Sequence, residues 1–269
     1  MATALRVLAF RVHRAAIAVA PMALAGQASA ASALMIWPID PVIEHDQPAV
    51  ALWVENRDKT PLTLQVRVVG WTQRDGQDVY DAAQNDIAGS PPMATVAPGK
   101  RQLIRLIKQV AVGPGKENAY RVFVDEIPRP DTDTESSQKD GLGPSLGIKF
   151  QMHYSIPLFV SGTDIWTKVD AEKRRNAQSA ALPVLHWRIQ EEGGKRWIFI
   201  RNSGAVHAKL TQMAVVTGER KTALPEGLFG YVLPGSIMRW EVPKSVSLQG
   251  VRQIVASVNG KESVSIASE

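Results

Sequence analysis

The stretch LGIKFQMHYSIPLFV, residues 146–160, carries the clearest structural signal in the chain. Every even-numbered position in it is apolar, whereas the odd-numbered positions from 147 to 157 are polar, glycine or proline. A period of two predicts a β-strand with one buried face. At about 3.3 Å per residue the strand would be roughly 50 Å long, two to three times the usual length. Such a strand either extends past its neighbours or pairs with two partners.

Shorter runs with the same alternation occupy most of the remaining chain. Short apolar runs also fit buried helical segments, but the β-branched residues and the regular turn spacing favour strands. Pro38 and Pro41 interrupt the first run, residues 33–44, and indicate an edge strand that changes sheets at Pro38. The further predicted strands are residues 49–55, 62–71, 101–110, 119–127, 185–190, 196–201, 208–216, 228–233, 237–242, 251–258 and 263–266.

Two polar stretches divide these runs. Residues 129–145 have almost no apolar side chains, and we expect a mobile loop there. Residues 161–178 are polar and charged, and we interpret them as the connection between two domains. The sequence therefore predicts an all-β protein with two β-sandwiches in tandem, at residues 31–162 and 163–269.

The N-terminus has the three parts of a secretory signal peptide. Arg6, Arg11 and Arg14 precede an apolar run at residues 15–25 and the small residues 28–30. A membrane anchor is the weaker interpretation, because a span needs about 20 apolar residues. Cleavage after Ala30 removes three arginines and no acid, so the formal charge falls from +5 to +2, which argues against a nucleic-acid partner. The chain contains no cysteine, and we expect a periplasmic protein without disulfides or a membrane span.

Local motifs give no support for an enzyme. The histidines are isolated, and no His or Cys pair has the spacing of metal ligands. The Ser-Gly pairs at 161–162 and 203–204 lack a nucleophile-elbow context, because no G-x-S-x-G follows a predicted strand and precedes a predicted helix, and no glycine-rich phosphate loop appears. Asp125 and Glu126 are adjacent in a predicted strand, so their carboxylates point to opposite faces and cannot share a substrate. We predict no catalytic residues, no cofactor and no metal.

Five segments carry a resemblance to a known family. The chain resembles the periplasmic chaperones of the chaperone–usher pathway, and the archaic or spore-coat-type branch in particular. That resemblance implies two immunoglobulin-like sandwiches in an L-shaped arrangement, pilus or fimbrial subunits as partners, and delivery to an outer-membrane usher. It also implies donor-strand complementation, in which the chaperone lends the last strand of its first domain to an incomplete subunit. The segments are RQLIRL (101–106), YRVFVDEIP (120–128), YSIPLFV (154–160), RNSGAVHAKL (201–210) and YVLPGSIMRWEVP (231–243).

On this sequence the lent strand is the stretch quoted first. We predict that Leu146, Ile148, Phe150 and Met152 enter the subunit, whereas residues 154–160 face the chaperone's own core. Each buried side chain of this kind contributes about 1.5 to 3 kcal/mol, before the costs of ordering and association.

The sequence departs from the family at the cleft between the domains. There, an Arg on the first strand and a Lys late in the donor strand bind the carboxylate at the subunit's C-terminus. The aligned positions are near Asp40 and Ser155, which cannot pair with a carboxylate. Lys149 and His153 are the candidate substitutes.

Two other function classes stay open at this point. One is a structural or adhesive subunit of a surface fibre, and the other is a glycan hydrolase or glycan-binding module. A fibre subunit usually has a single incomplete sandwich, and a glycan site needs clustered aromatic residues, whereas the tryptophans here are scattered. The sequence does not identify the subunit, nor does it decide whether the free chaperone self-associates.

Overall fold

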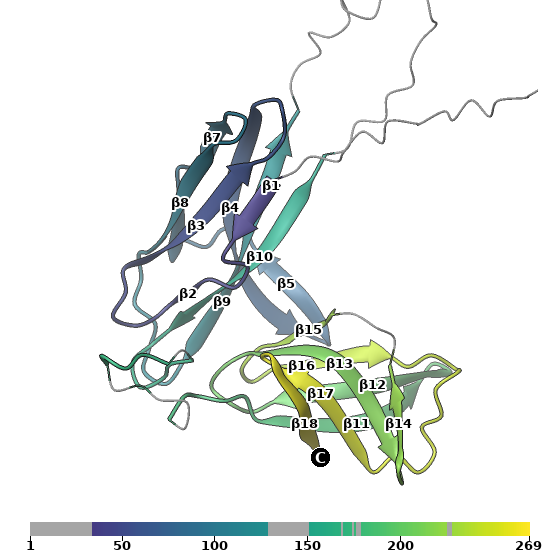
Figure 1. Cartoon of the computed structure of the whole chain (residues 1–269). Coiled ribbons are helices and arrows are strands. Elements are labelled where there is room, and N and C mark those ends of the chain that lie inside the picture. The colour runs from purple at the N-terminus through teal and green to yellow at the C-terminus, as the bar shows by residue number, and fades with distance from the viewer. Residues whose placement is uncertain (1–33, 129–150, 168, 174, 176–178, 225–227) are drawn as a thin grey trace, which may run out of the picture. The chain divides into compact units, whose positions relative to one another are not determined.

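The computed structural model describes residues 34–128, 151–167, 169–173, 175, 179–224 and 228–269, which all belong to one compact unit. Every regular element in these ranges is a β-strand (Figure 1). They contain no helix long and apolar enough to cross a membrane. The expected signal peptide, the expected loop at 129–145 and residues 146–150 lie outside the described residues.

Two sheets form the first sandwich. One has the order β1 (Leu34–Trp37), β3 (Ala49–Asn56), β8 (Arg101–Lys108) and β6 (Ile87–Ser90). The other has the order β2 (Val42–Ile43), β10 (His153–Ser161), β9 (Glu117–Ile127), β4 (Leu62–Arg74) and β5 (Gln77–Asp81), and β7 (Met93–Val96) also pairs with β4. The chain leaves the first sheet after β1 and enters the second at β2, which confirms the predicted change of sheet at Pro38.

The core of this sandwich lies between the inward faces of the two sheets. Alternate residues of the central strands reach it, as the period of two predicts. Leu52 and Ile104 come from the first sheet, and Leu64, Val122 and Leu158 from the second, all with no exposed surface. The outward residues of β10, β9 and β4 are thereby left on the opposite face of the second sheet.

The second sandwich uses the strands from β11 onward, in the order β14-β13-β17-β18-β11-β12-β16, with β15 also paired to β13. Ile198, Leu210, Met213 and Ile254 are buried at the centre of its core. Its strands are β11 (Leu185–Glu192), β12 (Lys195–Asn202), β13 (Ala208–Thr217), β14 (Arg220–Ala223), β15 (Leu228–Val232), β16 (Ile237–Glu241), β17 (Gln253–Val258) and β18 (Lys261–Ser268).

The predicted all-β class with two sandwiches is confirmed. The predicted division of the chain at residue 162 stays a prediction. Several strand boundaries differ from the sequence expectation. The one that matters most is that of β10, which begins at His153, so that Gln151 and Met152 precede it. The Met152 carbonyl still accepts a hydrogen bond from the Glu126 N–H at 3.2 Å, so the ladder with β9 extends one residue beyond the strand.

Candidate functional site

The strand β10 has an open edge in its first half. β9 pairs with it along its whole length, from His153 opposite Asp125 to Ser161 opposite Glu117. On the other side β2 pairs only with Phe159 and Val160, in parallel. In the described part of the chain, residues 153–158 therefore have no strand on that side. An unpaired edge offers free backbone groups to another chain.

The register shows which backbone groups face this edge. Met152 accepts its hydrogen bond on the β9 side, and the Phe159 N–H points the other way, to the Pro41 carbonyl at 3.3 Å. Backbone groups alternate between sides along a strand, so His153, Ser155 and Pro157 face the open edge. Proline has no N–H, so only His153 and Ser155 offer donors there.

The side chains of β10 also alternate, between the core of the first sandwich and the outward face of its sheet. Ile156, Leu158 and Val160 are buried in the core of the first sandwich, and Tyr154 packs against it. This confirms that the even-numbered residues from 154 to 160 serve the core of the first sandwich, whereas Phe159 packs in a separate cluster. The period of two places the half-buried Met152 on the same side. Leu146, Ile148 and Phe150 lie outside the described residues, so their role as lent side chains stays a prediction.

On the outward face, His153 is engaged by its own sheet. Its ring Nδ1 forms a hydrogen bond with one carboxylate oxygen of Asp125, and Arg67 pairs with the other carboxylate oxygen at 2.8 Å. Burial acts to raise the pKa of Asp125, but the hydrogen bonds from Arg67 and His153 outweigh it and lower that pKa below its usual value. The His153 ring also packs on Phe123, with ring centres 4.9 Å apart. These contacts fix His153 beside the open edge.

The candidate cleft residues do not form one site in the described ranges. Asp40 and Ser155 are exposed, and no hydrogen bond or ion pair joins either of them to His153. Asp40 lines a cavity of about 410 Å³ together with Phe159, His207 and Lys261. Lys149 lies outside the described residues. Their roles at a cleft stay predictions.

The structure adds an aromatic cluster that the sequence did not indicate. Trp71 and Phe159 from the first sandwich pack with Tyr231 and Leu233 from the second, and all four are buried. The Arg121 guanidinium lies over the Trp71 ring, 3.8 Å from its centre, and 5.3 Å from the centre of Tyr231. The sequence signal for Arg121 was only its outward position in an alternating strand. Its ring partners come from distant strands.

Side-chain hydrogen bonds join the same two sandwiches. The Gln73 side chain donates to the Tyr231 carbonyl and accepts from the Leu233 N–H, both at 2.8 Å. The buried Glu117 carboxylate accepts from the His207 N–H at 2.8 Å and contacts the His207 ring at 2.9 Å. Because each carboxamide or carboxylate bonds across the junction twice, the junction has a defined geometry.

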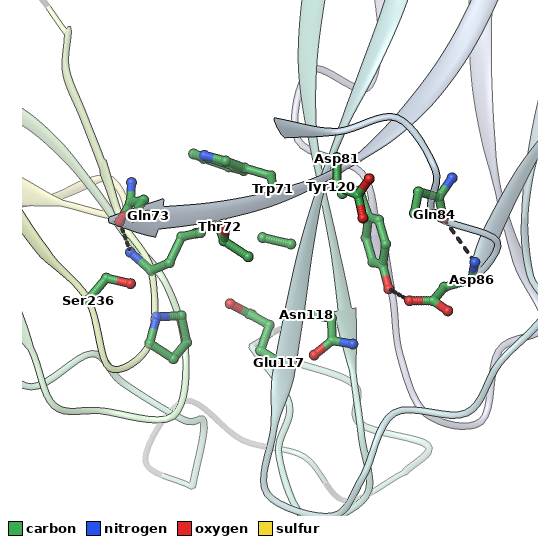
Figure 2. Close-up of a pocket in the computed structure, with 14 residues that line it drawn as sticks. Trp71, Thr72, Gln73, Asp81, Gln84, Asp86, Glu117, Asn118, Tyr120 and Ser236 are labelled. Carbon is green, nitrogen blue, oxygen red and sulfur yellow. Dashed lines mark hydrogen bonds between the residues drawn. The ribbon is translucent and has the colours of Figure 1, made fainter. Parts of the chain in front are cut away.

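A cavity of about 360 Å³ lies beside these bonds, between the end of β4 and the start of β9 (Figure 2). Asp81, Asp86 and Glu117 are among its lining residues, and none of the lining residues is basic. The Tyr120 hydroxyl donates to Asp86 at 2.9 Å. Across the described ranges, no three His, Cys, Asp or Glu residues gather as a metal site requires.

Comparison with known proteins agrees with this architecture. Residues 40–165 match the family model described as pili and flagellar-assembly chaperone, PapD N-terminal domain. No curated protein sequence matches the chain. Among solved structures, the chaperone–tip adhesion subunit pre-assembly complex CsuC–CsuE, from the archaic chaperone–usher Csu pili of Acinetobacter baumannii, gives 31% identity and a TM-score of 0.69. The match covers 88% of this chain and 100% of the other.

Two more distant structures share the fold. The complex of the Salmonella enterica SafA pilin with the SafB chaperone matches at 15% identity and a TM-score of 0.56, over 88% of this chain and 95% of the other. The Pseudomonas aeruginosa CupB2 chaperone matches at 14% identity and a TM-score of 0.53, over 86% and 96%. The match to the archaic Csu complex confirms the family indicated by the sequence segments. The chain belongs to the pilus-assembly chaperones of the chaperone–usher pathway.

Proposed function

We propose that this protein is a periplasmic chaperone that binds a pilus subunit through β10 and delivers it to an outer-membrane usher. The observation that carries the proposal is the open edge at residues 153–158, directly after the alternating residues 146–152. In this proposal residues 1–30 direct export, residues 31–162 bind the subunit and residues 163–269 form the second domain. The protein acts by binding and carries no enzymatic activity.

Pairing of strands explains how such an edge holds an unfinished sandwich. A subunit strand laid along β10 receives the backbone donors of His153 and Ser155, whatever its side chains are. Leu146, Ile148, Phe150 and Met152 then provide the missing apolar face, and their alternation sets the register. Burial of four such side chains contributes about 6 to 12 kcal/mol gross, which is comparable with the cost of association, so the backbone pairing along the edge contributes to binding as well.

The alternation also provides the sharpest test. We expect Phe150→Asp to abolish recovery of the cognate subunit on co-expression, because a charge would be placed inside the subunit core. Gln151→Asp is the matched control, since it adds the same charge one residue away on the opposite face and should leave recovery near the wild-type level. Equal recovery with both variants would remove the donor role from this strand.

A further inference from the structure

The cavity of about 360 Å³ lies where β4 and β9 separate (Figure 2). The ladder between these strands ends at Trp71 and Ala119, and β4 continues beyond it beside β5. One row before that end, Gly70 lies between Asp81 of β5 and Tyr120 of β9. A Cβ atom at Gly70 would meet Asp81 at 3.5 Å, an ordinary contact distance, so the backbone has room for a side chain there. The glycine therefore leaves this part of the cavity open.

The wall of the cavity is acidic. Its lining residues include Asp81, Asp86 and Glu117, and none of them is a lysine, an arginine or a histidine. One oxygen of Asp81 accepts a hydrogen bond from the Ala83 N–H, and one oxygen of Asp86 accepts from the Tyr120 hydroxyl, both at 2.9 Å. In the described part of the chain, the second oxygen of each aspartate forms no hydrogen bond and no ion pair. These two oxygens can accept from a ligand.

Glu117 adds a buried charge to the same wall. Its side chain has no exposed surface, and its Oε1 accepts a hydrogen bond from the His207 N–H and contacts the His207 ring. Its Oε2 is buried and has no hydrogen-bond partner in the described ranges. A buried carboxylate oxygen without a donor is costly. A cation in the cavity reduces that cost, because Coulomb attraction is strong where water is excluded.

The spread of the carboxylates fits an organic cation better than a metal ion. Among the described residues, no three acidic or histidine side chains gather closely enough to hold a metal. Figure 2 shows Asp81 and Asp86 beside Tyr120. Glu117 lies further along the wall, on the side of Ser236. An ammonium group has three donors and no acceptor, which suits a wall of carboxylate and hydroxyl oxygens.

We propose that this cavity binds a protonated alkyl amine, either a free amine or the ammonium group of a lysine side chain in a partner protein. The ammonium group donates to the second oxygen of Asp81 or Asp86, and its charge compensates that of Glu117. Because the acids occupy two parts of the wall, a linear diamine binds more tightly than a monoamine. None of the lining residues belongs to β10, so this site does not depend on the function proposed above.

The test is titration of the mature protein at neutral pH with butylamine, putrescine and butanol, followed by NMR at the indole N–H of Trp71. Trp71 lines the cavity, and its indole N–H donates to Asp78 at 2.9 Å, so its signal reports on the site. Loss of that signal in Trp71→Phe assigns it. We expect butylamine to bind with a Kd on the order of 10 mM, putrescine about tenfold more tightly and butanol at least about tenfold more weakly than butylamine.

Variants of the wall separate the cavity from the rest of the surface. Gly70→Val fills the cavity without changing a charge, and we expect it to weaken butylamine binding about tenfold or more. Asp81→Asn removes one charge, and we expect a loss of about threefold. Glu117→Gln should act in the same direction, and the first two variants keep the test decisive if it unfolds. Glu191→Gln is the control, because Glu191 is an exposed acid of the second sandwich outside the cavity, and it should bind butylamine as the wild type does.

Three results would overturn the proposal: no shift with either amine, equal binding of butanol and butylamine, or unchanged butylamine binding in both Gly70→Val and Asp81→Asn. Displacement of butylamine by calcium chloride at equal concentration would also overturn it, since the site would then hold a metal ion. The acetylated and amidated tripeptides Gly-Lys-Gly and Gly-Gln-Gly identify the source of the amine. If the lysine peptide binds as tightly as butylamine and the glutamine peptide does not bind, the cavity takes a lysine side chain of a partner protein. If neither peptide binds but butylamine does, the ligand is a free amine.

Discussion

The last strands of the two sandwiches, β10 and β18, have similar pairings and different surroundings. β10 pairs antiparallel with β9 and, over two residues, parallel with β2. β18 pairs antiparallel with β17 and, over two residues, parallel with β11. In the described part of the chain, each strand therefore leaves its first six residues, 153–158 and 261–266, without a partner on one side.

The edge of β18 has protective features that β10 lacks. The turn at Asn259 and Gly260, both at positive φ, joins it tightly to β17, so the strand cannot lengthen at its start. Lys261 and Glu262 are exposed, and Ser263 has a positive φ. Charges and local distortions of this kind oppose pairing with another chain. The open edge of β10 follows an alternating apolar run instead, which supports the first sandwich as the one that binds a subunit.

The two sandwiches nevertheless share one stabilising feature. In each, a buried asparagine at the end of a strand is hydrogen-bonded to a Pro-Gly turn, and we call this arrangement the corner. Asn56 ends β3 and Asn202 ends β12, and both are fully buried. The peptide N–H of the glycine in a Pro-Gly turn, Gly99 or Gly235, donates to each asparagine carbonyl at 2.8 Å. Each side-chain amide also donates to two carbonyls at 2.7 to 3.0 Å, those of Thr60 and Val96 in the first sandwich and Val206 and Val232 in the second.

The largest effects are expected at this shared corner. Asn56→Ala and Asn202→Ala should each lower the free energy of unfolding by about 3 to 5 kcal/mol, because buried carbonyl and N–H groups lose their partners. Urea unfolding followed by tryptophan fluorescence would measure this. The exposed Asn85→Ala is the control, with an expected change within about 0.5 kcal/mol. A much smaller loss for Asn56→Ala than for Asn202→Ala would show that the corners are not equivalent.

The corner also shows what sequence can and cannot predict. The alternation at Ile156, Leu158 and Val160 predicted their burial, because one face of a strand must meet the core. The regular spacing of turns between the strands was predicted as well. The burial of Asn202 was not predicted, since a turn asparagine is ordinarily exposed and its burial here depends on the Val232 carbonyl, 30 residues away in the sequence. The same limit applies to Arg121, whose ring partners are set by the register between strands and by the junction.

The stability of the protein at high pH depends on β9, the strand that pairs with β10 along its whole length. Burial raises the pKa of Tyr120, in β9, to about 12, and its hydrogen bond to Asp86 acts in the same direction. In the unfolded state the pKa of tyrosine is about 10. Between pH 10 and pH 12, ionisation of Tyr120 therefore stabilises the unfolded state but not the folded state. The wild type should therefore lose about 2 to 3 kcal/mol of stability over that range.

Tyr120→Phe provides the comparison for this titration, because phenylalanine fills the core without a titratable group. Urea unfolding at several pH values from 10 to 12 would measure how much free energy of unfolding the wild type loses relative to the variant. The ionisation of Tyr80 and Tyr154 is common to both proteins and cancels in the difference. A parallel decline of the two proteins would contradict the assignment to Tyr120.

The smallest effect is expected at Asp125, which joins β4, β9 and the start of β10 through Arg67 and His153. The pairs are partly exposed, so Asp125→Asn should cost less than about 1 kcal/mol at neutral pH. The folded pKa of Asp125 is lowered, so its contribution is present above the ordinary value of 3.8 and disappears as the pH falls through the folded pKa. Urea unfolding at neutral pH and below 3.8 would measure both the contribution and its loss.

Because Arg67 should lose its partner in the same range, Arg67→Gln in a double-mutant cycle should show coupling with Asp125→Asn only at the higher pH. Coupling that persists in acid would mean that the contacts of Asp125 hold the edge of β10 by packing rather than by charge.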